Sequence, residues 1–381
     1  MNRKLRMGMV GGGLGGFIGD VHRKAAQFTG EAEVVAGAFS TNAKRSKQTG
    51  KSLYLDPKRI YGSYQEMLAG ELALPADQRI DFVSVVTPNN GHYPISKAFL
   101  EAGFNVLCEK PLTMNLKQAL ALRDVVRKSG KVFGLMHNYT GYPMVKQAKA
   151  MVAAGTLGQI RKVVVEYSLG WLASPQASKQ AVWRVDPNIA GPCGCMGDIG
   201  THSQNLIKYI TGMDIEELCA DLTSFVPGRQ VDDDGSVLLR FKDGAKGAVF
   251  CSEVSTGQEN NFRIYIYGTE GALEWRQETP EDLFLRSNVE PMRVYRRGWA
   301  GVGPEAAAAT HLPAGHPEGF LEAFANVYAN FLACIKARAK GDSQAGGDFP
   351  GIEEGVEEMV FLDCLLKNVK GKAKWTKVPK L

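Results

Sequence analysis

The sequence lacks the features of a membrane or secreted protein. Its apolar stretches, such as 82–86 and 163–165, fall far short of the ~20 residues that a membrane span requires. The amino terminus begins with basic residues, but glycines replace the apolar core of a signal peptide and no cleavage site follows. The seven cysteines are an odd number, which argues against a secreted disulfide framework. We therefore expect reduced thiols and a cytoplasmic protein.

The chain also lacks an excess of one charge. Its 45 Lys and Arg residues against 40 Asp and Glu leave a net charge of only +5, and no basic stripe interleaved with aromatics is present. We therefore expect no nucleic-acid partner. Nor do we expect a metal, since Cys193 and Cys195, near His202 in sequence, fit no common zinc pattern. The length of 381 residues predicts two or three domains at about 150 residues each.

Residues 1–137 predict a parallel sheet. Short apolar runs rich in β-branched residues alternate here with helical patterns at 93–102 and 116–127. Alternation of this kind favours a parallel sheet covered on both faces. The runs expected as strands are 5–10, 33–39, 80–87, 105–109 and 131–136.

Residues 138–381 follow another pattern. Strand-like runs joined by tight turns, such as Asp-Gly at 234–235 and 243–244, indicate an antiparallel sheet and hence an α+β domain. We expect strands at 161–170, 217–226, 236–241, 245–254, 262–268 and 272–275, and helices at 144–154, 198–210, 318–338 and 352–369. The stretch 171–197 has few periodic signals. We expect Asp232–Asp234 to form a charged turn and 276–317 to form a long surface excursion.

A glycine-rich segment follows the first expected strand. Gly11, Gly13 and Gly16 satisfy G-x-G-x-x-G between a strand and a helix, as the dinucleotide-binding fingerprint requires. A glycine permits the tight turn, and a missing Cβ lets backbone N–H groups approach a pyrophosphate at the helix N-terminus. The alternative is a glycine-rich turn that serves packing only. We interpret the segment as a nucleotide-binding loop.

The second expected strand ends without the acidic residue that would hold a ribose 2′-hydroxyl. It ends instead in Ser40 and Thr41, and Arg45 follows in a basic stretch. A 2′-phosphate favours such surroundings because a guanidinium binds it bidentately. The alternative is a solvated basic helix. The pattern favours NADP over NAD.

The third and fourth expected strands end in further polar residues. Loops at the carboxyl ends of parallel strands line the ligand crevice, so we expect both segments to face a cofactor. For Asn89 and His92, the alternative is a helix N-cap and a surface histidine. A Lys110 at a buried strand end favours proton transfer or oxyanion stabilisation, and the alternative is an exposed lysine before a turn. The cofactor candidates in these segments are Thr87, Pro88, Asn89, His92, Glu109 and Lys110.

The second half contributes a carboxylate and a histidine. Asp198 and His202 are four residues apart on one face of a helix expected to begin at Asp198. A histidine exchanges protons near neutral pH, and an adjacent carboxylate can orient it. The alternative is an N-capping aspartate and a surface histidine. Candidates for contact with a sugar ring, in the irregular stretch, are Trp171, Trp183 and Arg184, with hydrophobic packing as the alternative.

The order of these motifs resembles a known family. GGGLGG, TPNNGH, CEKPL and GDIGTH stand here in the order found in the Gfo/Idh/MocA family of nicotinamide-dependent oxidoreductases, and the likeness covers nearly the whole chain. EKP followed by G-D-x-x-x-H is its specific part. The segments HNYTGYPMV and AGHPEGF resemble a bacterial branch that includes levoglucosan and glucoside 3-dehydrogenase-like members.

The resemblance implies an α/β fold: a Rossmann domain at 1–137, and at 138–381 a substrate-binding and oligomerisation domain with a large open, mostly antiparallel sheet. It implies that Lys110 contacts substrate and joins proton transfer, that Asp198 and His202 bind substrate, and that His202 is the base. It places Asn138 near the cofactor or substrate. The 40–45 segment is similar to that of NADPH-dependent anhydrofructose reductases. A homodimer or homotetramer is expected.

We therefore expect NAD(P)-dependent hydride transfer to or from a secondary hydroxyl or ketone of a cyclic sugar, glycoside or polyol. One alternative is a glycosidase that uses bound NAD through transient oxidation at C3. The other is a non-catalytic nucleotide-sensing protein, which would have no use for Lys110, Asp198 and His202 together.

Overall fold

The computed structural model describes residues 3–176 and 178–380. The chain forms two compact units: Met1–Asn138 with Phe324–Val356, and Tyr139–Ala323 with Glu357–Leu381. The predicted division into 1–137 and 138–381 assigned Phe324–Val356 to the second domain. As a division by function, it stays a prediction. Within the described residues, no helix has the length and apolar character of a bilayer span.

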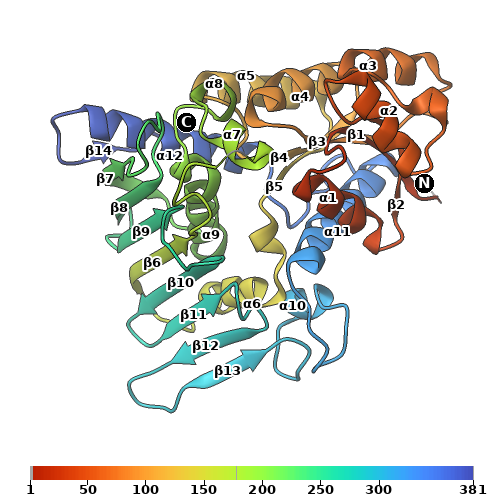
Figure 1. The fold of residues 1–381 in the computed structure, drawn as a ribbon. Helices are drawn as coiled ribbons and strands as arrows, with labels where there is room; N and C mark the ends of the chain where they lie inside the picture. Colours follow the sequence, from red (N-terminus) through yellow and green to blue (C-terminus); the bar gives the residue numbers. More distant parts are fainter. Residues whose placement is uncertain (1–2, 177, 381) are drawn as a thin grey trace. The chain divides into compact units, whose positions relative to one another are not determined.

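The first unit contains a five-stranded parallel sheet in the order β2-β1-β3-β4-β5 (Figure 1). The sheet confirms the predicted α/β fold. Its strands are β1 (Leu5–Gly11), β2 (Ala32–Ala38), β3 (Phe82–Val86), β4 (Asn105–Glu109) and β5 (Phe133–Met136). The connecting helices are α1 (Phe17–Phe28), α2 (Ala43–Ser52), α3 (Tyr64–Ala73), α4 (His92–Glu101) and α5 (Leu116–Ser129).

Short polar residues set where several of these helices begin. Asn42, Ser63 and Asn115 lie in extended backbone before α2, α3 and α5, and each side chain accepts a backbone N–H of the first turn. Each cap pairs a backbone donor that the first turn of the helix would otherwise leave without a partner.

A later segment of the chain, Phe324–Val356, completes the first unit. Helix α11 (Phe320–Ala339) presents Phe331 edge-on to Phe82 at 5.5 Å between ring centroids. Further along, Pro350 accepts a hydrogen bond from the backbone N–H of Leu135 at 2.8 Å. These contacts bury apolar surface beside β3 and β5, which explains why the returning segment belongs to this unit.

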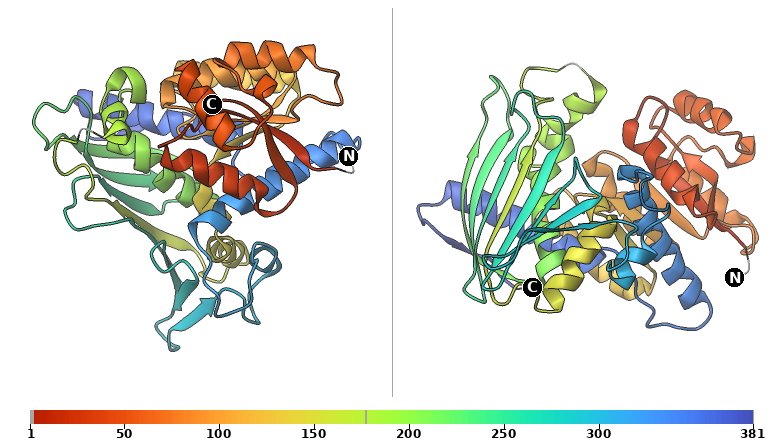
Figure 2. Two further views of the ribbon diagram at one scale, coloured as in Figure 1. Left: turned by 45° about the vertical axis from the view of Figure 1, so that its right-hand side comes forward. Right: turned by 90° about the horizontal axis from the view of Figure 1, so that it is seen from below.

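The second unit contains a nine-stranded sheet in the order β13-β12-β11-β10-β6-β9-β8-β7-β14, antiparallel except for the β6–β9 pair. Figure 2 shows α6 (Pro143–Ala153) and α9 (Thr201–Thr211) on one face of it. The strands are β6 (Ile160–Ser168), β7 (Ile215–Thr223), β8 (Asp234–Phe241), β9 (Lys246–Ser252), β10 (Asn261–Gly268), β11 (Ala272–Arg276), β12 (Asp282–Arg286), β13 (Arg293–Arg296) and β14 (Thr376–Lys377). The other helices are α7 (Lys179–Arg184), α8 (Pro187–Ala190), α10 (Pro304–Ala308) and α12 (Ile352–Lys370).

The predictions for 276–317 and for Asp232–Asp234 are wrong. The stretch 276–317 is not a simple surface excursion, since it adds β12, β13 and α10 to the fold. The sequences DLFLR of β12 and RVYR of β13 lack the apolar alternation that marks a strand. The turn expected at Asp232–Asp234 is also absent from these described residues. Asp233 is buried, its carboxylate accepts the backbone N–H groups of Phe225 and Val226, and Asp234 begins β8.

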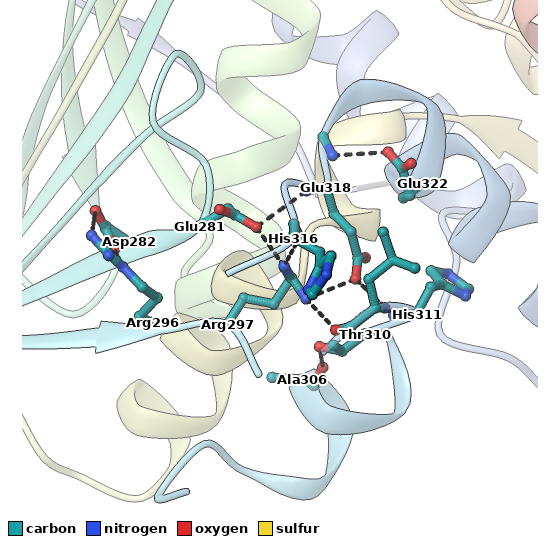
Figure 3. Close-up of polar contacts among 12 residues, drawn as sticks. Glu281, Asp282, Arg296, Arg297, Ala306, Thr310, His311, His316, Glu318 and Glu322 are labelled. Carbon is teal, nitrogen blue, oxygen red and sulfur yellow. Dashed lines mark hydrogen bonds and ion pairs between the residues drawn. The ribbon is translucent and has the colours of Figure 1, made fainter. Parts of the chain in front are cut away.

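A buried ion cluster fastens the segment after β13 (Figure 3). The guanidinium of Arg297 donates to Glu281 at 2.6 Å and to Glu318 at 2.8 Å, and also to the carbonyl oxygen of Leu312 at 2.7 Å. One Glu318 oxygen also accepts the backbone N–H groups of His311 and Leu312. A single buried cation therefore joins the residue before β12 to two parts of the segment after β13.

Replacing this cation should weaken the second unit. We expect Arg297→Leu to lower the free energy of unfolding by roughly 3 kcal/mol, because it leaves the buried Glu318 and the partly buried Glu281 without a counterion. The neighbouring Arg296 is exposed and pairs with Asp282 at 2.6 Å, so Arg296→Leu is the matched control and should leave stability unchanged. Urea unfolding followed by circular dichroism measures both. Equal stability of the two variants would contradict the assigned role of Arg297.

Candidate functional site

The candidate residues of the first unit lie where parallel strands end. The Gly-rich loop follows β1, the 40–45 segment follows β2, Thr87–His92 follows β3, and Lys110 follows β4. Asn138 comes two residues after β5. The carboxyl ends of parallel strands meet at one edge of a sheet, so these segments share the edge at which open α/β sheets bind ligands.

The geometry of the Gly-rich loop depends on missing side chains. Gly11 has a φ of +87°, and a Cβ built on it would lie 2.3 Å from the carbonyl oxygen of Val86. A Cβ on Gly13 would lie 2.7 Å from the carbonyl oxygen of Phe39, at the end of β2. Gly16 is the N-cap of α1, and Leu14 and Phe17 beside it are exposed. The start of α1 is therefore accessible to an anion such as a pyrophosphate.

Two buried polar atoms at this edge have no hydrogen-bond partner: Thr87 Oγ1 after β3 and Asn138 Nδ2 after β5. Orphaned polar atoms in a buried position need an explanation, and a polar ligand supplies one. Together with the glycine cradle, these atoms make the residues present fit a dinucleotide.

The segment after β2 has the polar character expected from the sequence. Ser40 accepts the backbone N–H of Asn42 at 3.2 Å, and Asn42 in turn caps α2 by accepting the backbone N–H of Arg45. The side chains of Thr41 and Arg45 are exposed. Because neither side chain is buried, both can reach a ribose phosphate.

His92 lies inside the first unit and not on its surface. Its ring is fully buried, with Nδ1 2.7 Å from the carbonyl oxygen of Pro111 and Nε2 2.9 Å from that of Thr87. The surface-histidine alternative is therefore wrong. The asparagine N-cap is also wrong, because Gly91 is the N-cap of α4 and Asn89 lies in a short 3-10 turn. His92 fastens the ends of β3 and β4 to each other, and its contact with a cofactor stays a prediction.

Glu109 supplies a buried negative charge beside Lys110. It accepts a hydrogen bond from His22 Nε2 at 2.6 Å and one from the backbone N–H of Lys110 at 3.1 Å. Burial raises the pKa of Glu109, but the hydrogen bond and charge of His22 with the charge of Lys110 outweigh it, so the net pKa is lowered. His22 is held in turn by Tyr328 at 2.7 Å. Sequence reasoning missed His22, because nothing in the α1 pattern distinguishes it.

The second unit brings Asp198 together with the substrate candidates of the irregular stretch. Arg184 Nε donates to Asp198 Oδ2 at 2.9 Å. The same guanidinium lies over the rings of Trp183 and Trp171, at 4.3 and 5.5 Å from their centroids. The ion pair with Asp198 and the contacts with the two tryptophan rings therefore fix the position of the Arg184 guanidinium.

The helix does not begin at Asp198. A π-helical turn, Met196–Gly200, precedes α9, and the backbone N–H of Asp198 already bonds to Gly194. The N-cap alternative for Asp198 is thus wrong. The carboxylate of Asp232 holds the start of the turn instead, accepting the N–H groups of Gly194 at 2.8 Å and Met196 at 2.7 Å. π-Helical turns are rare and occur frequently at functional sites.

His202 is buried among aromatic side chains, so the surface alternative for it is wrong as well. The ring of Tyr139 packs edge-on against it at 4.8 Å between centroids. Tyr139 and Tyr167 join their hydroxyl groups at 2.6 Å, and Tyr167 donates to Asn260 at 2.9 Å. Burial raises the pKa of Tyr139 to about 12, which keeps its hydroxyl neutral. No sequence motif marks either tyrosine as a site residue, although the alternation of 163, 165 and 167 indicates that Tyr167 faces inward.

The two cysteines of this region are buried thiols. Burial raises the pKa of Cys193 and of Cys195, and the charge of nearby Asp232 raises both further. Neutral thiols are poor metal ligands, since a metal binds the thiolate. Among the residues that the structure describes, no group of three or more His, Cys, Asp or Glu could hold a metal ion.

Comparison with known proteins matches a family model to each unit. Residues 5–137 match the oxidoreductase family with an NAD-binding Rossmann fold, and residues 145–274 match the GFO/IDH/MocA C-terminal domain. An uncharacterised oxidoreductase from Bacillus subtilis (strain 168) is 36% identical over 84% of this chain and 82% of its own length.

Two further relatives have named activities. Levoglucosan dehydrogenase from Pseudarthrobacter phenanthrenivorans is 27% identical over 78% of this chain and 81% of its own length. An inositol dehydrogenase homologue from Azotobacter vinelandii, solved with NADH and myo-inositol, is 34% identical. It superimposes with a TM-score of 0.93, covering 99% of this chain and 98% of the homologue.

Proposed function

Because the chain belongs to the Gfo/Idh/MocA family of NAD-binding oxidoreductases, we propose that it moves a hydride between nicotinamide and a secondary hydroxyl or ketone of a cyclic sugar, glycoside or polyol. The family and fold predicted from the motifs are confirmed. The observation that carries the proposal is the buried His202, four residues after a carboxylate that Arg184 holds in place. The named activities of the levoglucosan and inositol relatives support the substrate class.

Each candidate residue has a proposed task. When bound, the nicotinamide supplies the hydride acceptor or donor. His202 takes the proton of the substrate hydroxyl, and Lys110 donates a hydrogen bond to the oxygen as negative charge develops on it. Asp198 accepts a hydrogen bond from a neighbouring hydroxyl. Residues 1–137 hold the nucleotide, while 138–381 bind substrate and form the oligomer contact. The protein acts in the cytoplasm.

The proposed nucleotide contacts come from the strand ends of the first unit. The Gly11–Gly16 loop holds the pyrophosphate, and Thr87 and Asn138 offer their unpaired polar atoms. The remaining proposed contacts are Pro88, Asn89, His92, Glu109 and Lys110. At the ribose, Ser40, Thr41 and Arg45 support acceptance of a 2′-phosphate, so we propose NADP as the preferred form. The inositol relative was solved with NADH, so both nucleotides belong in the test.

One face of the nine-stranded sheet supports the proposed oligomer. Strand alternation and register put Leu238, Phe250, Tyr267 and Val294 on the same face, and all four are exposed. Several large apolar side chains on one exposed face mark an interaction surface. We propose that a second copy of the chain covers this face.

A single cuvette experiment tests the reaction. The protein is mixed with a nitrophenyl glucoside, myo-inositol or levoglucosan and with NAD or NADP, and reduced nicotinamide and free nitrophenolate are followed together. We expect nicotinamide reduction without nitrophenolate release. Nitrophenolate without net reduction would favour the redox glycosidase. Nucleotide binding with no turnover on any of these substrates would favour the sensor.

His202→Ala should separate turnover from nucleotide binding. Loss of the base should lower kcat by roughly 100-fold or more, while the Kd for the nucleotide stays within about twofold. His316→Ala is the matched control, because this histidine is exposed, and it should retain activity. Stopped-flow turnover and nucleotide fluorescence titration give the two quantities. Unimpaired turnover in His202→Ala would refute its assignment as the base.

Arg45→Ala should weaken NADPH selectively. Removing a guanidinium from a 2′-phosphate costs about 1.5–3 kcal/mol, or roughly 10- to 150-fold in Kd, and should leave NADH unchanged. Lys51→Ala, at the far end of the same helix, is the control. Titration of all three proteins with both nucleotides measures the difference. An equal loss for NADH would remove the argument for the 2′-phosphate.

Phe250→Asp should lower the order of the oligomer. A buried unpaired carboxylate at the centre of an interface opposes association, whereas Tyr54→Asp changes an exposed residue of the first unit and should not. Light scattering after size exclusion gives the mass of each protein. A wild-type monomer, or a Phe250→Asp variant with unchanged mass, would overturn the proposed interface.

A further inference from the structure

Glu253 is a buried carboxyl group that the proposed reaction does not use. It directly follows β9, and its residue is only 3% exposed. Its backbone is fixed from two sides, since its N–H donates to the carbonyl oxygen of Asp233 at 2.9 Å and its carbonyl oxygen accepts the N–H of Leu172 at 3.0 Å. Its side chain forms a hydrogen bond with the carboxyl group of Asp198, and its Oε1 has no partner.

Two hydrogen-bonded carboxyl groups cannot both be ionised, because one of them must provide the proton. The surroundings decide which one does. The side chain of Asp198 keeps 18% exposure and receives the Arg184 guanidinium at 2.9 Å. Glu253 has neither solvent nor a direct cation contact among the interactions described above. Burial, and then the charge of Asp198, raise the pKa of Glu253 well above its ordinary value, and the more distant charge of Arg184 only partly opposes this.

The groups around the pair do not reverse this assignment. The carboxylate of Asp232 raises the pKa of Glu253 further, and the thiols of Cys195 and Cys251 are kept neutral by burial. Arg184 is the nearby cation, and its Nε is committed to Asp198. The titratable and charged groups facing Glu253 are Asp198, Arg184, Asp232, Cys195 and Cys251.

We propose that Glu253 is a positioning residue that remains a neutral acid and donates its proton in a hydrogen bond to Asp198. With Arg184 on one oxygen and Glu253 as a further donor, Asp198 keeps its negative charge and a fixed orientation. The carboxylate then presents only acceptor positions to a substrate hydroxyl. This consequence for substrate rests on the proposed function, whereas the protonation of Glu253 does not.

The first test needs no substrate. A glutamate whose pKa is raised in the folded state binds a proton that the unfolded state releases, so it destabilises the protein as pH rises above about 4.3. Glu253→Gln removes this titration and keeps a donor. We expect the Tm of the variant to match wild type near that pH and to exceed it by a few degrees at pH ~7. The exposed Glu259→Gln is the control and should show no such trend.

Infrared spectra in deuterium oxide at neutral pH give a direct readout. Wild type should show a protonated-carboxyl band that is missing in Glu253→Gln and kept in Glu259→Gln. A Tm difference that does not grow with pH, together with the absence of this band, would overturn the proposal. Neither result depends on finding the substrate, so failure of the dehydrogenase assay leaves this test decisive.

The second test separates positioning from packing. Glu253→Gln should keep kcat/KM within about threefold of wild type, because its amide still donates to Asp198. Glu253→Leu has a similar volume but no donor, so it should lose about tenfold or more. Equal loss in both variants would mean that Glu253 acts as an anion, and full activity of Glu253→Leu would mean that it has no role. If the leucine variant fails to fold, the glutamine variant and its infrared spectrum still decide.

Discussion

A carboxylate that leaves water must receive donors or a proton, and this requirement shapes the candidate site of each unit. Glu109 receives His22 and a backbone N–H, Asp232 receives two backbone N–H groups, and Asp198 receives Arg184. Each carboxylate therefore fixes the element that supplies its donors. This requirement helps to place the end of β4, the π-helical turn and α7.

Buried neighbouring residues hold the candidate contact residues Lys110 and His202 in place. Lys110 leaves a strand whose last residue is a buried anion, so its position is set before any ligand arrives. His202 follows a turn that Asp232 holds, and its ring is fixed by Tyr139. Groups held in one geometry lose little entropy when a substrate binds, and such preorganisation is where a protein contributes to hydride chemistry that its cofactor carries.

The sequence predicted the parts of the fold whose signals are local. Short apolar runs with β-branched residues placed β1 and β4 almost to the residue. The roles that motif order assigned to Gly11, Lys110, Asp198 and His202 stay predictions. The sequence could not predict supporting residues such as Glu253. The partners of Glu253 lie far away along the chain, and no spacing between motifs marks this residue. The same reason explains the wrong turn at Asp232–Asp234, since a run of acids looks solvated until the backbone that they cap is known. Beyond residue 276, β12 has three apolar residues in a row and β13 is a short strand with an arginine at each end, so neither shows the alternation that marks a strand.

The arrangement around Asp198 bears on the choice between an enzyme and a nucleotide sensor. A protonated glutamate against a carboxylate costs stability, and replacing buried polar groups by apolar ones of equal size is often neutral or stabilising. A sensor that only binds a nucleotide in its first unit gains nothing from such a pair in its second. An enzyme does gain, because a charged and oriented Asp198 beside a buried His202 is what binding and deprotonating a hydroxyl requires. The stability that the protein loses by burying Glu253 against Asp198 therefore favours catalysis more than any single motif does.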